Sequence, residues 1–382
     1  MRRYDAAVIG GGVAGSSMAA ALAGMGWSTV LIDQDTCPRH KVCGEFLSPE
    51  SLDSLSVLGL LPLLQLLQPS AMRTVRLTSV NEWTLDIPLP GTALGISRFA
   101  LDHALQQAAQ ERGAELISGT AVISIGSRNG EGHRLELRGR SVRQIVEARA
   151  VIGAWGRRPR TGLAPAASVL HQSYVGVKAH YFGMERGDRV ELYLFPGGYL
   201  GIAPIEGNRH NVAALMTREA FYHAGKSVQN AIEWAAERNP ALQRRLVGGM
   251  PLAETRAAVY PVAISRKPTA WGQVPLIGDA AVMIPPLCGD GMAVALRTVV
   301  LCSRWADEFL RGSLGLDEWR QQYTRALRQE CMPPLRWGRW LQKMLGSRVT
   351  SPLLFRLGYR LPGLAGRMVE RTRITCVNPR ER

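Results

Sequence analysis

The chain has 382 residues, of which 46% are hydrophobic and 20% charged, a composition typical of a globular protein that buries one or two sizeable cores. Its six cysteines form neither CxxC pairs nor a dense framework, which argues against structural zinc and against a secreted disulfide scaffold. The formal net charge is +15. We therefore expect a basic, cytoplasmic protein without a metal site.

The first expected elements flank a glycine-rich turn. Residues 4–9 suit a short buried strand and residues 13–26 suit an alanine-rich helix. Gly10 permits a tight turn, Gly12 lets a pyrophosphate approach the backbone, and Gly15 lets helix and strand pack closely, with the phosphates at the helix N-terminus. The expected contacts of a dinucleotide with this turn are Gly10, Gly12, Val13, Ala14 and Gly15.

A second strand, over residues 28–32, leads into Asp33. An acid at this point can accept hydrogen bonds from both ribose hydroxyls and would repel a 2′-phosphate, so FAD or NAD fits and NADP does not. We expect Gln34, the next residue, to lie at the same site. Hydropathy alone would also allow a signal peptide or membrane span over residues 6–32. The many glycines and the β-branched final strand favour the nucleotide site.

The middle of the chain mixes helical and strand periodicity. Helices are expected over residues 49–59 and 98–112, and the runs between residues 173 and 216 suit an antiparallel sheet in a second layer. The pattern favours interleaved domains over consecutive ones. The other expected strands cover residues 72–79, 82–88, 121–125, 134–138, 143–152, 190–195 and 199–203.

A second glycine-rich region begins after a short expected strand over residues 274–277. That strand ends at Gly278-Asp279, whose acid can hydrogen-bond a polyol such as a ribityl chain. A turn over residues 289–292 then opens a long helix to about residue 311, so free N–H groups and a positive dipole end would face a ligand. Such donors can stabilise negative charge on a reduced isoalloxazine.

The positive charge is concentrated near the C-terminus. Between residues 320 and 382 there are 14 basic residues and three acidic ones, and apolar residues interleave with the arginines. This pattern favours amphipathic helices with a basic outer face. Such a face would attract an acidic protein or an anionic membrane surface, or it is simply a solvated surface. No recognition motif supports binding of nucleic acid.

Four motifs together resemble a flavoprotein family that includes the aromatic hydroxylases, the flavin-dependent halogenases and the geranylgeranyl reductases. The motifs are Gly10-x-Gly12-x-x-Gly15 with Asp33, Arg39-His40-Lys41-Val42-Cys43-Gly44-Glu45, Arg98-x-x-Leu101-Asp102-x-x-Leu105, and Gly278-Asp279-Ala280-Ala281 with Pro285-Pro286-x-x-Gly289-x-Gly291-Met292. The resemblance covers about residues 1–312. It implies a mixed α/β fold like that of para-hydroxybenzoate hydroxylase, in which a Rossmann-like FAD-binding domain is interleaved with an antiparallel-sheet substrate domain.

The resemblance also implies a domain division and cofactor contacts. Residues 1–70, 98–165 and 265–312 would bind FAD, and residues 71–97 and 166–264 would form the substrate domain. Residues 313–382 lie beyond the resemblance, and their arginine-rich amphipathic pattern predicts a basic helical cap. Asp33 would hold the adenosine ribose, and Arg39 and Arg98 would lie near the phosphates and ribityl chain. The remaining implied contacts are Gln34, Lys41, Cys43, Gly44, Gly278, Asp279, Pro286, Gly289, Gly291 and Met292.

Departures from the family patterns leave the reaction open. Hydroxylases of the family carry Asp-Gly where this chain has Trp155-Gly156, which leaves either NADH or NADPH, or a partner reductase, as electron donor. Tryptophan halogenases show Trp-x-Trp-x-Ile-Pro and geranylgeranyl reductases show Tyr-x-Trp-x-Phe-Pro. This chain offers Tyr199-Leu200-Gly201-Ile202-Ala203-Pro204 instead.

The leading interpretation is an FAD-dependent monooxygenase that hydroxylates an aromatic or polyketide-like substrate through a flavin C4a-hydroperoxide. The substrate is a small molecule, either free or tethered to a carrier protein. The alternatives are an olefin reductase of the geranylgeranyl reductase type, a halogenase, and a flavin-binding partner or sensor without turnover. The catalytic candidates are Cys43, Glu45 and Tyr199. Further pocket candidates are Tyr193, Phe195 and His180, and we expect the thiol of Cys43 or Cys288 near the isoalloxazine.

Overall fold

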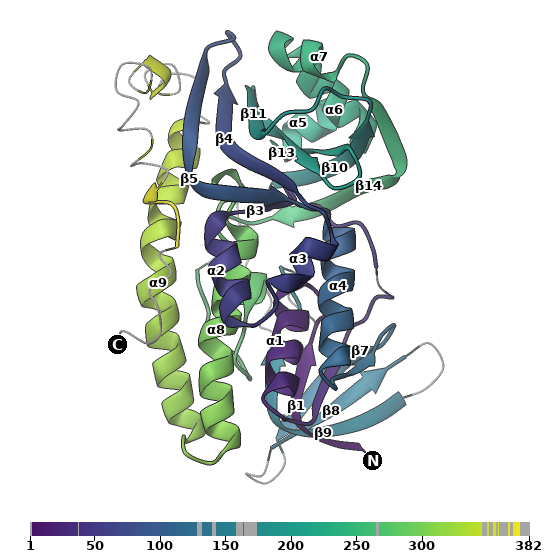
Figure 1. Ribbon diagram of the computed structural model, residues 1–382, viewed down its shortest axis with the longest axis vertical. Helices are drawn as coiled ribbons and strands as arrows, with labels where there is room; N and C mark the ends of the chain where they lie inside the picture. Colours follow the sequence, from purple (N-terminus) through teal and green to yellow (C-terminus); the bar gives the residue numbers. More distant parts are fainter. Residues whose placement is uncertain are drawn as a thin grey trace.

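The described residues form two β-sheets with helices packed around them. Figure 1 shows the larger sheet at one end of an elongated molecule and the smaller sheet at the other, with two long helices, α8 and α9, along one side. Cys37 and Cys376 lie outside the described residues. The computed structural model describes residues 2–36, 38–127, 132–139, 143–157, 163, 174–264, 267–345, 350, 354–356, 358, 366 and 370–374.

The smaller sheet contains the first predicted strands and has the order β6-β2-β1-β9-β8-β7. Strands β6, β2, β1 and β9 run parallel, and β8 and β7 continue the sheet antiparallel. In the centre, Ala6 of β1 lies opposite Thr29 on one side and Ala150 on the other. The strands are β1 (Arg2–Ile9), β2 (Thr29–Ile32), β6 (Glu115–Ile117), β7 (Ala121–Ser127), β8 (His133–Arg138) and β9 (Arg143–Gly153).

The larger sheet has the order β14-β10-β13-β12-β11-β4-β5-β3. Its neighbouring strands are antiparallel except β11 and β4, which run parallel. This sheet is the antiparallel second layer that the sequence pattern predicts. The strands are β3 (Phe46–Leu47), β4 (Ser70–Thr78), β5 (Thr84–Gly95), β10 (Tyr174–Phe182), β11 (Arg189–Phe195), β12 (Gly198–Ile205), β13 (Arg209–Thr217) and β14 (Met250–Val262).

Helices cover the faces of both sheets. Helix α1 packs against α4 and α8, α8 packs against α9, and the short helices α5 to α7 cover one face of the larger sheet (Figure 1). The side chain of Ser97 caps α4 by accepting a hydrogen bond from the Ala100 N–H. The helices are α1 (Val13–Gly24), α2 (Pro49–Val57), α3 (Pro62–Leu66), α4 (Arg98–Glu111), α5 (Arg218–His223), α6 (Val228–Glu237), α7 (Pro240–Leu246), α8 (Gly291–Leu310) and α9 (Leu316–Leu345).

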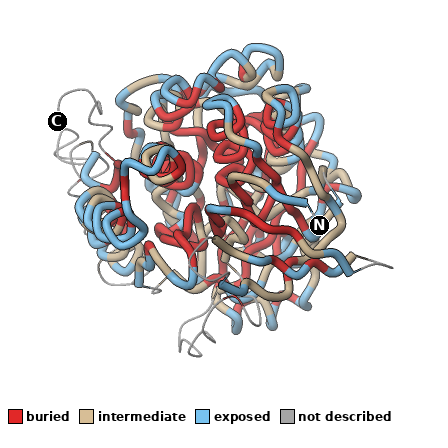
Figure 2. The backbone as a smooth tube through the Cα atoms, turned by 90° about the horizontal axis from the view of Figure 1, so that it is seen from below, coloured by how far each residue is buried: buried red, intermediate tan, exposed pale blue. Residues whose placement is uncertain are grey.

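Helix α9 (Leu316–Leu345) confirms the expected helical structure for the first part of the C-terminal region. Its inner face is tied to the core because Trp319 and Tyr323 are buried and the Tyr323 hydroxyl donates a hydrogen bond to the Leu276 carbonyl at 2.7 Å. Its outer face exposes arginines such as Arg320, Arg325 and Arg328. Figure 2 shows the buried residues running through the interior and the exposed ones along the outer turns. Within the described ranges, no helix is both long and apolar enough to span a bilayer.

One expected strand is wrong. Residues 274–277 form isolated bridges, with Leu276 beside Gly153 at the end of β9 and Pro275 opposite Trp271. The reason is that β9 ends at Gly153, so Leu276 is the residue of this segment that pairs with the sheet. The chain then enters a single 3₁₀ turn, η1 (Gly278–Ala280). The division into three domains remains a proposal.

Candidate functional site

The turn between β1 and α1 is shaped by glycines that admit no side chain. A Cβ on Gly15 would lie 1.7 Å from the Gly10 carbonyl oxygen, and Gly10 itself has a φ of +111°. At Gly12 the situation differs, because a Cβ there would first meet two cationic groups, Arg98 Nη2 at 3.5 Å and Lys41 Nζ at 3.8 Å. Gly12 is also the N-cap of α1, whose first N–H groups receive no side-chain cap. This turn therefore offers free donors and positive charge to an anion.

Lys41 and Arg98 share one carboxylate. Lys41 Nζ lies 2.7 Å from Asp102 Oδ2, and Arg98 Nε lies 2.8 Å from Asp102 Oδ1. Burial alone would raise the pKa of Asp102, but Arg98 and Lys41 together hold that pKa below its ordinary value, so the carboxylate stays ionised. Two cations and one anion leave a net positive charge beside Gly12.

Asp33 holds the turn from the end of β2. It is 6% exposed, and its carboxylate accepts hydrogen bonds from the Gly11 N–H at 2.8 Å and the Asp35 N–H at 3.1 Å. Gln34 and Arg39, two further expected contacts, lie at the exposed rim. Arg39 forms an ion pair with Asp35 there. The carboxylate of Asp33 is therefore fixed at the edge of the turn, and the other two side chains are held less firmly.

The second glycine-rich region meets the first. A Cβ on Gly278 would lie 2.9 Å from the Cβ of Ala14 in α1, and the Gly278 N–H donates to Thr298 Oγ1 in α8 at 2.8 Å. Asp279, the next residue, lies 3.7 Å from Arg157 Nε. The two regions, far apart in the sequence, thus form one continuous site.

The start of α8 borders an apolar cavity of about 200 Å³. Pro286 and Gly289 line it, while Gly291 and Met292 form the first turn of the helix. Residues of the larger sheet also line the cavity, together with Leu341 and Leu345 of α9. Cys43, Gly44, Tyr199 and Cys288 also line the cavity. The expectation of a thiol near the isoalloxazine remains a prediction.

The side chains of two expected pocket residues lie on the face of the larger sheet opposite the cavity. Tyr193 and Phe195 pack into the core beneath α5 to α7, and Phe195 meets Trp234 edge to face at 5.7 Å between ring centroids. Alternate side chains of a strand point to opposite faces, so Leu192 of the same strand lines the cavity instead. His180 is buried and contacts Glu45.

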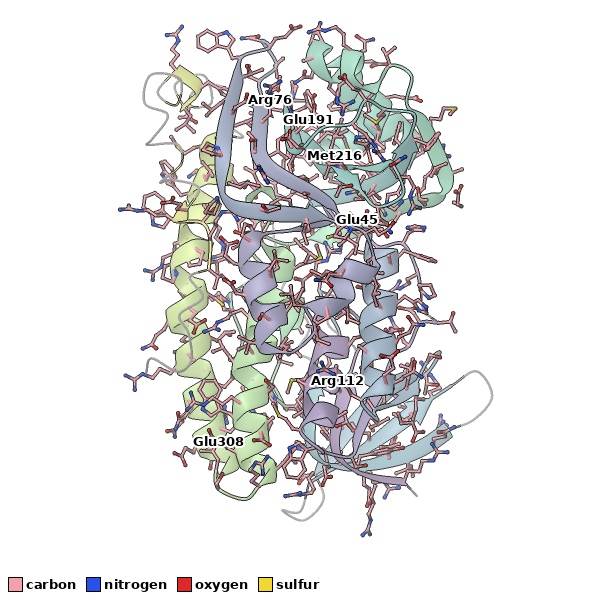
Figure 3. All side chains as sticks on the ribbon, viewed as in Figure 1. Glu45, Arg76, Arg112, Glu191, Met216 and Glu308 are labelled. Atoms are coloured by element: carbon pink, nitrogen blue, oxygen red, sulfur yellow. The ribbon has the colours of Figure 1, made fainter. Side chains whose placement is uncertain are left out.

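Glu45 is buried at the junction between the larger sheet and α4, where Figure 3 labels it. Its Oε1 accepts hydrogen bonds from Lys178 Nζ at 2.8 Å and from the Arg98 N–H at 3.0 Å, and its Oε2 lies 2.6 Å from His180 Nε2. Its backbone adopts the left-handed region, with a φ of +55°. Both carboxylate oxygens are therefore engaged by protein groups, and the catalytic role expected for Glu45 remains a prediction.

Lys178 is a buried residue at this junction that the sequence analysis did not single out. Neither Lys178 nor Glu45 has any exposed side-chain surface. Burial alone would raise the pKa of Glu45, but the hydrogen bond from His180 and the charge of Lys178 hold it below its ordinary value. The pKa of nearby His40 is lowered to about 4 by burial and by the Lys178 charge, so His40 is neutral at pH 7. A lysine in the otherwise apolar run of β10 was the available signal.

Comparison with known proteins decides the family. A family model described as "FAD binding domain" matches residues 3–323. The chain belongs to this family. It is 26% identical to a menaquinone reductase of Mycolicibacterium smegmatis, over 78% of this chain and 74% of that protein. It is 22% identical to a 1H-pyrrole-2-carbonyl-[peptidyl-carrier protein] brominase of Pseudoalteromonas luteoviolacea, over 84% and 80%.

The fold is shared with solved flavoproteins. The flavin-dependent brominase Bmp2 superposes with a TM-score of 0.79 at 18% identity, covering 98% of this chain and 95% of that one. The mixed α/β fold and the resemblance to this flavoprotein family are therefore confirmed. The residues present fit FAD, since the turn at Gly12 is open towards two cations and Asp33 stands at its edge. The individual FAD contacts remain proposals.

We predict that Arg98→Gln weakens FAD binding about tenfold or more, because it removes one cation beside Gly12 and leaves Lys41 neutralised by Asp102. The measurement is a titration of the apoprotein with FAD, followed by flavin fluorescence. Arg304→Gln, which removes an exposed arginine of α8, is the matched control and should bind FAD like the native protein. Unchanged affinity in Arg98→Gln would contradict the phosphate role.

We predict that Lys178→Met destabilises the protein by about 3–5 kcal/mol, because it leaves the buried carboxylate of Glu45 without its cation. Urea unfolding followed by circular dichroism measures this loss. The double variant Glu45→Gln/Lys178→Met should recover part of the loss, since it removes both charges. If the single and double variants are equally unstable, the ion pair is not the cause.

Proposed function

We propose that this protein is an FAD-dependent reductase that saturates a carbon–carbon double bond in an aliphatic, lipid- or polyketide-like substrate. The observation that carries the proposal is the aliphatic lining of the cavity beside α8. This gives olefin reduction precedence over the hydroxylation that the sequence motifs favour. The family membership supports an FAD-dependent oxidoreductase in either case.

The floor of the cavity is built from rows of small and aliphatic residues on adjacent strands. Gly201 lies opposite Ala213 on one side and Leu192 on the other, and Leu192 lies opposite Leu77. All four line the cavity. A second row is formed by Val190, Val75 and Ile87 in the same way.

This floor suits an aliphatic chain better than an aromatic ring. Glycine and alanine leave a depression over the middle strands, while the valine, leucine and isoleucine side chains give it apolar walls. Among the described residues that line the cavity, Phe46 and Tyr199 are the aromatic ones. The cavity thus offers little surface for ring stacking. The similarity to a menaquinone reductase over most of the chain also supports reduction.

The protein's own contribution is to exclude water and to supply a proton. Bound FAD would supply a hydride to one carbon of the double bond. The other carbon needs a proton, and Tyr199 and Cys288 line the cavity as proton-bearing groups. Burial raises the pKa of Tyr199 and raises that of Cys288 to about 12, so both stay protonated at neutral pH. We propose Tyr199 as the donor.

The test is anaerobic turnover of the purified holoenzyme with dithionite-reduced FAD and geranylgeraniol as probe. The expected product, detected by mass spectrometry, carries two or more additional hydrogens and no additional oxygen. Oxidised flavin should appear in proportion to the double bonds saturated. The proposal is overturned if the flavin stays reduced in the presence of geranylgeraniol and shorter polyprenols, and if the same reduced enzyme gives an oxygenated product once O2 is admitted.

A second candidate is halogenation or hydroxylation of a small or carrier-tethered substrate. It is favoured by the similarity to the carrier-protein brominase, which extends over 84% of this chain. In this case turnover requires O2, and bromide is incorporated into the product if the reaction is halogenation. The electron donor, whether NADH, NADPH or a partner reductase, is identified in the same assay by the rate at which each reduces the bound flavin.

We predict that Gly201→Leu raises the KM for a polyprenol substrate about tenfold, because the new side chain fills the depression over β12. A Cβ at Gly201 would meet no atom closer than Leu192 Cδ2 at 3.3 Å, so the substitution enters the cavity without a backbone clash. Gly187→Leu, in an exposed turn, is the matched control. An unchanged KM together with unchanged FAD binding would show that the chain does not run over this floor.

A further inference from the structure

The described segment 370–374 forms part of the cavity wall, although it follows the start of α8 by about 80 residues. Thr372 and Arg373 line the cavity next to Cys288 and Gly289. Ile374 is 2% exposed and belongs to the main core. The sequence reading found no motif here. The structure makes this stretch a component of the site.

Arg373 joins two elements that reach the cavity from different directions. Its Nη1 lies 3.0 Å from Glu50 Oε2, in the first turn of α2, and 3.5 Å from Asp290 Oδ1, at the N-cap of α8. The side chains of Arg373 and Asp290 are 6% and 1% exposed. Among the described residues, Arg373, buried Asp290 and partly buried Glu50 thus form a charged cluster at the first turn of α8.

Asp290 is unusual for an N-cap. Its side chain makes no capping hydrogen bond to α8, and neither its Oδ2 nor Arg373 Nε has a hydrogen-bond partner among the described residues. The pKa of Asp290 is raised to about 7. Burial and the charge of Glu50 raise it, and the charge of Arg373 and a hydrogen bond with Ser48 lower it by less. The neighbouring Cys288 thiol stays neutral, since its pKa is raised to about 12. Asp290 therefore changes charge near neutral pH.

We propose that Arg373 is a positioning residue of the flavin site, which holds the first turn of α8 and offsets the Asp290 carboxylate where a reduced flavin would carry negative charge. The positive end of the α8 dipole favours an anion at this turn, and an unbalanced carboxylate at the N-cap opposes it. The positive charge of Arg373 offsets this carboxylate. The proposal rests on FAD binding by the family and holds for reduction and oxygenation alike.

The charges predict a pattern of flavin reduction potentials. Arg373→Gln removes the cation beside Asp290 and Glu50 and raises the pKa of Asp290, so the potential of bound FAD should fall at alkaline pH, where Asp290 is ionised in this variant as well. Asp290→Asn removes the negative charge, so the potential should rise. The double variant should return towards the native value. Arg371→Gln is the matched control, because Arg371 is exposed and its guanidinium lies over the Trp337 ring at 5.0 Å.

The pH dependence supplies an independent readout. Reduction of a flavin bound at this turn would add negative charge there and would raise the pKa of Asp290, which would couple proton uptake to reduction near pH 7. The native potential should therefore depend more steeply on pH around 7 than that of Asp290→Asn. Spectroelectrochemical titration of the holoenzymes between pH 6 and 10 measures both effects.

The outcomes separate the electrostatic role from a structural one. The proposal is overturned if the reduction potential of Arg373→Gln equals that of the native protein. It is also overturned if the potential of the double variant is as low as that of Arg373→Gln. If Arg373→Gln does not fold, Asp290→Asn decides alone, because Glu50 still pairs Arg373, and an unchanged pH dependence in that variant overturns the proposal. If the holoenzyme shows the expected reduction potentials but does not saturate polyprenols, the proposed reaction is wrong and the positioning role of Arg373 is still supported.

Discussion

The close contact between Gly278 and Ala14 is the constraint on which the site depends. Any side chain at Gly278 would collide with the Cβ of Ala14, so η1 can lie directly on α1. The hydrogen bond from Gly278 to Thr298 ties the same turn to α8. Two helix N-termini are thereby held in one region, and each carries the positive end of its dipole. FAD matches this arrangement, because its anionic pyrophosphate lies between the adenosine and the isoalloxazine, and the isoalloxazine gains negative charge when it is reduced.

The larger sheet separates two kinds of chemistry by the alternation of its strands. One face packs Tyr193 and Phe195 against the short helices and serves stability. The other face offers the aliphatic floor of the cavity, and it also places Lys178 beneath the loop that carries Glu45. Because Glu45 binds α4 and β10 at once, that loop cannot shift without breaking a buried ion pair.

Charge compensation recurs around the site, with a different balance each time. The cluster at Asp102 has two cations for one acid and so favours an anion at Gly12. The pair of Lys178 and Glu45 is neutral and holds a loop in place. The cluster at Arg373 has one cation for two acids, of which Asp290 can take up a proton near neutral pH. The net charge of each cluster thus depends on its position in the fold.

The sequence alone determined the features whose geometry is local. The strand, glycine turn and helix that begin the chain, the acid at position 33, and helix α4 all follow from spacing over a few residues, because backbone conformation is set by short-range interactions. Membership of an FAD-binding family was recognisable for the same reason.

Only the tertiary structure decided which distant side chains meet. Lys178 is 133 residues from Glu45, and Arg373 is 83 residues from Asp290, so neither pair leaves a periodic signal in the sequence. Strand alternation predicted two faces but not which face borders the cavity, and for this reason Tyr193 and Phe195 were assigned to the wrong side. The aliphatic floor depends on the register of five strands, β13, β12, β11, β4 and β5. Register and burial are set by the packing of the whole chain.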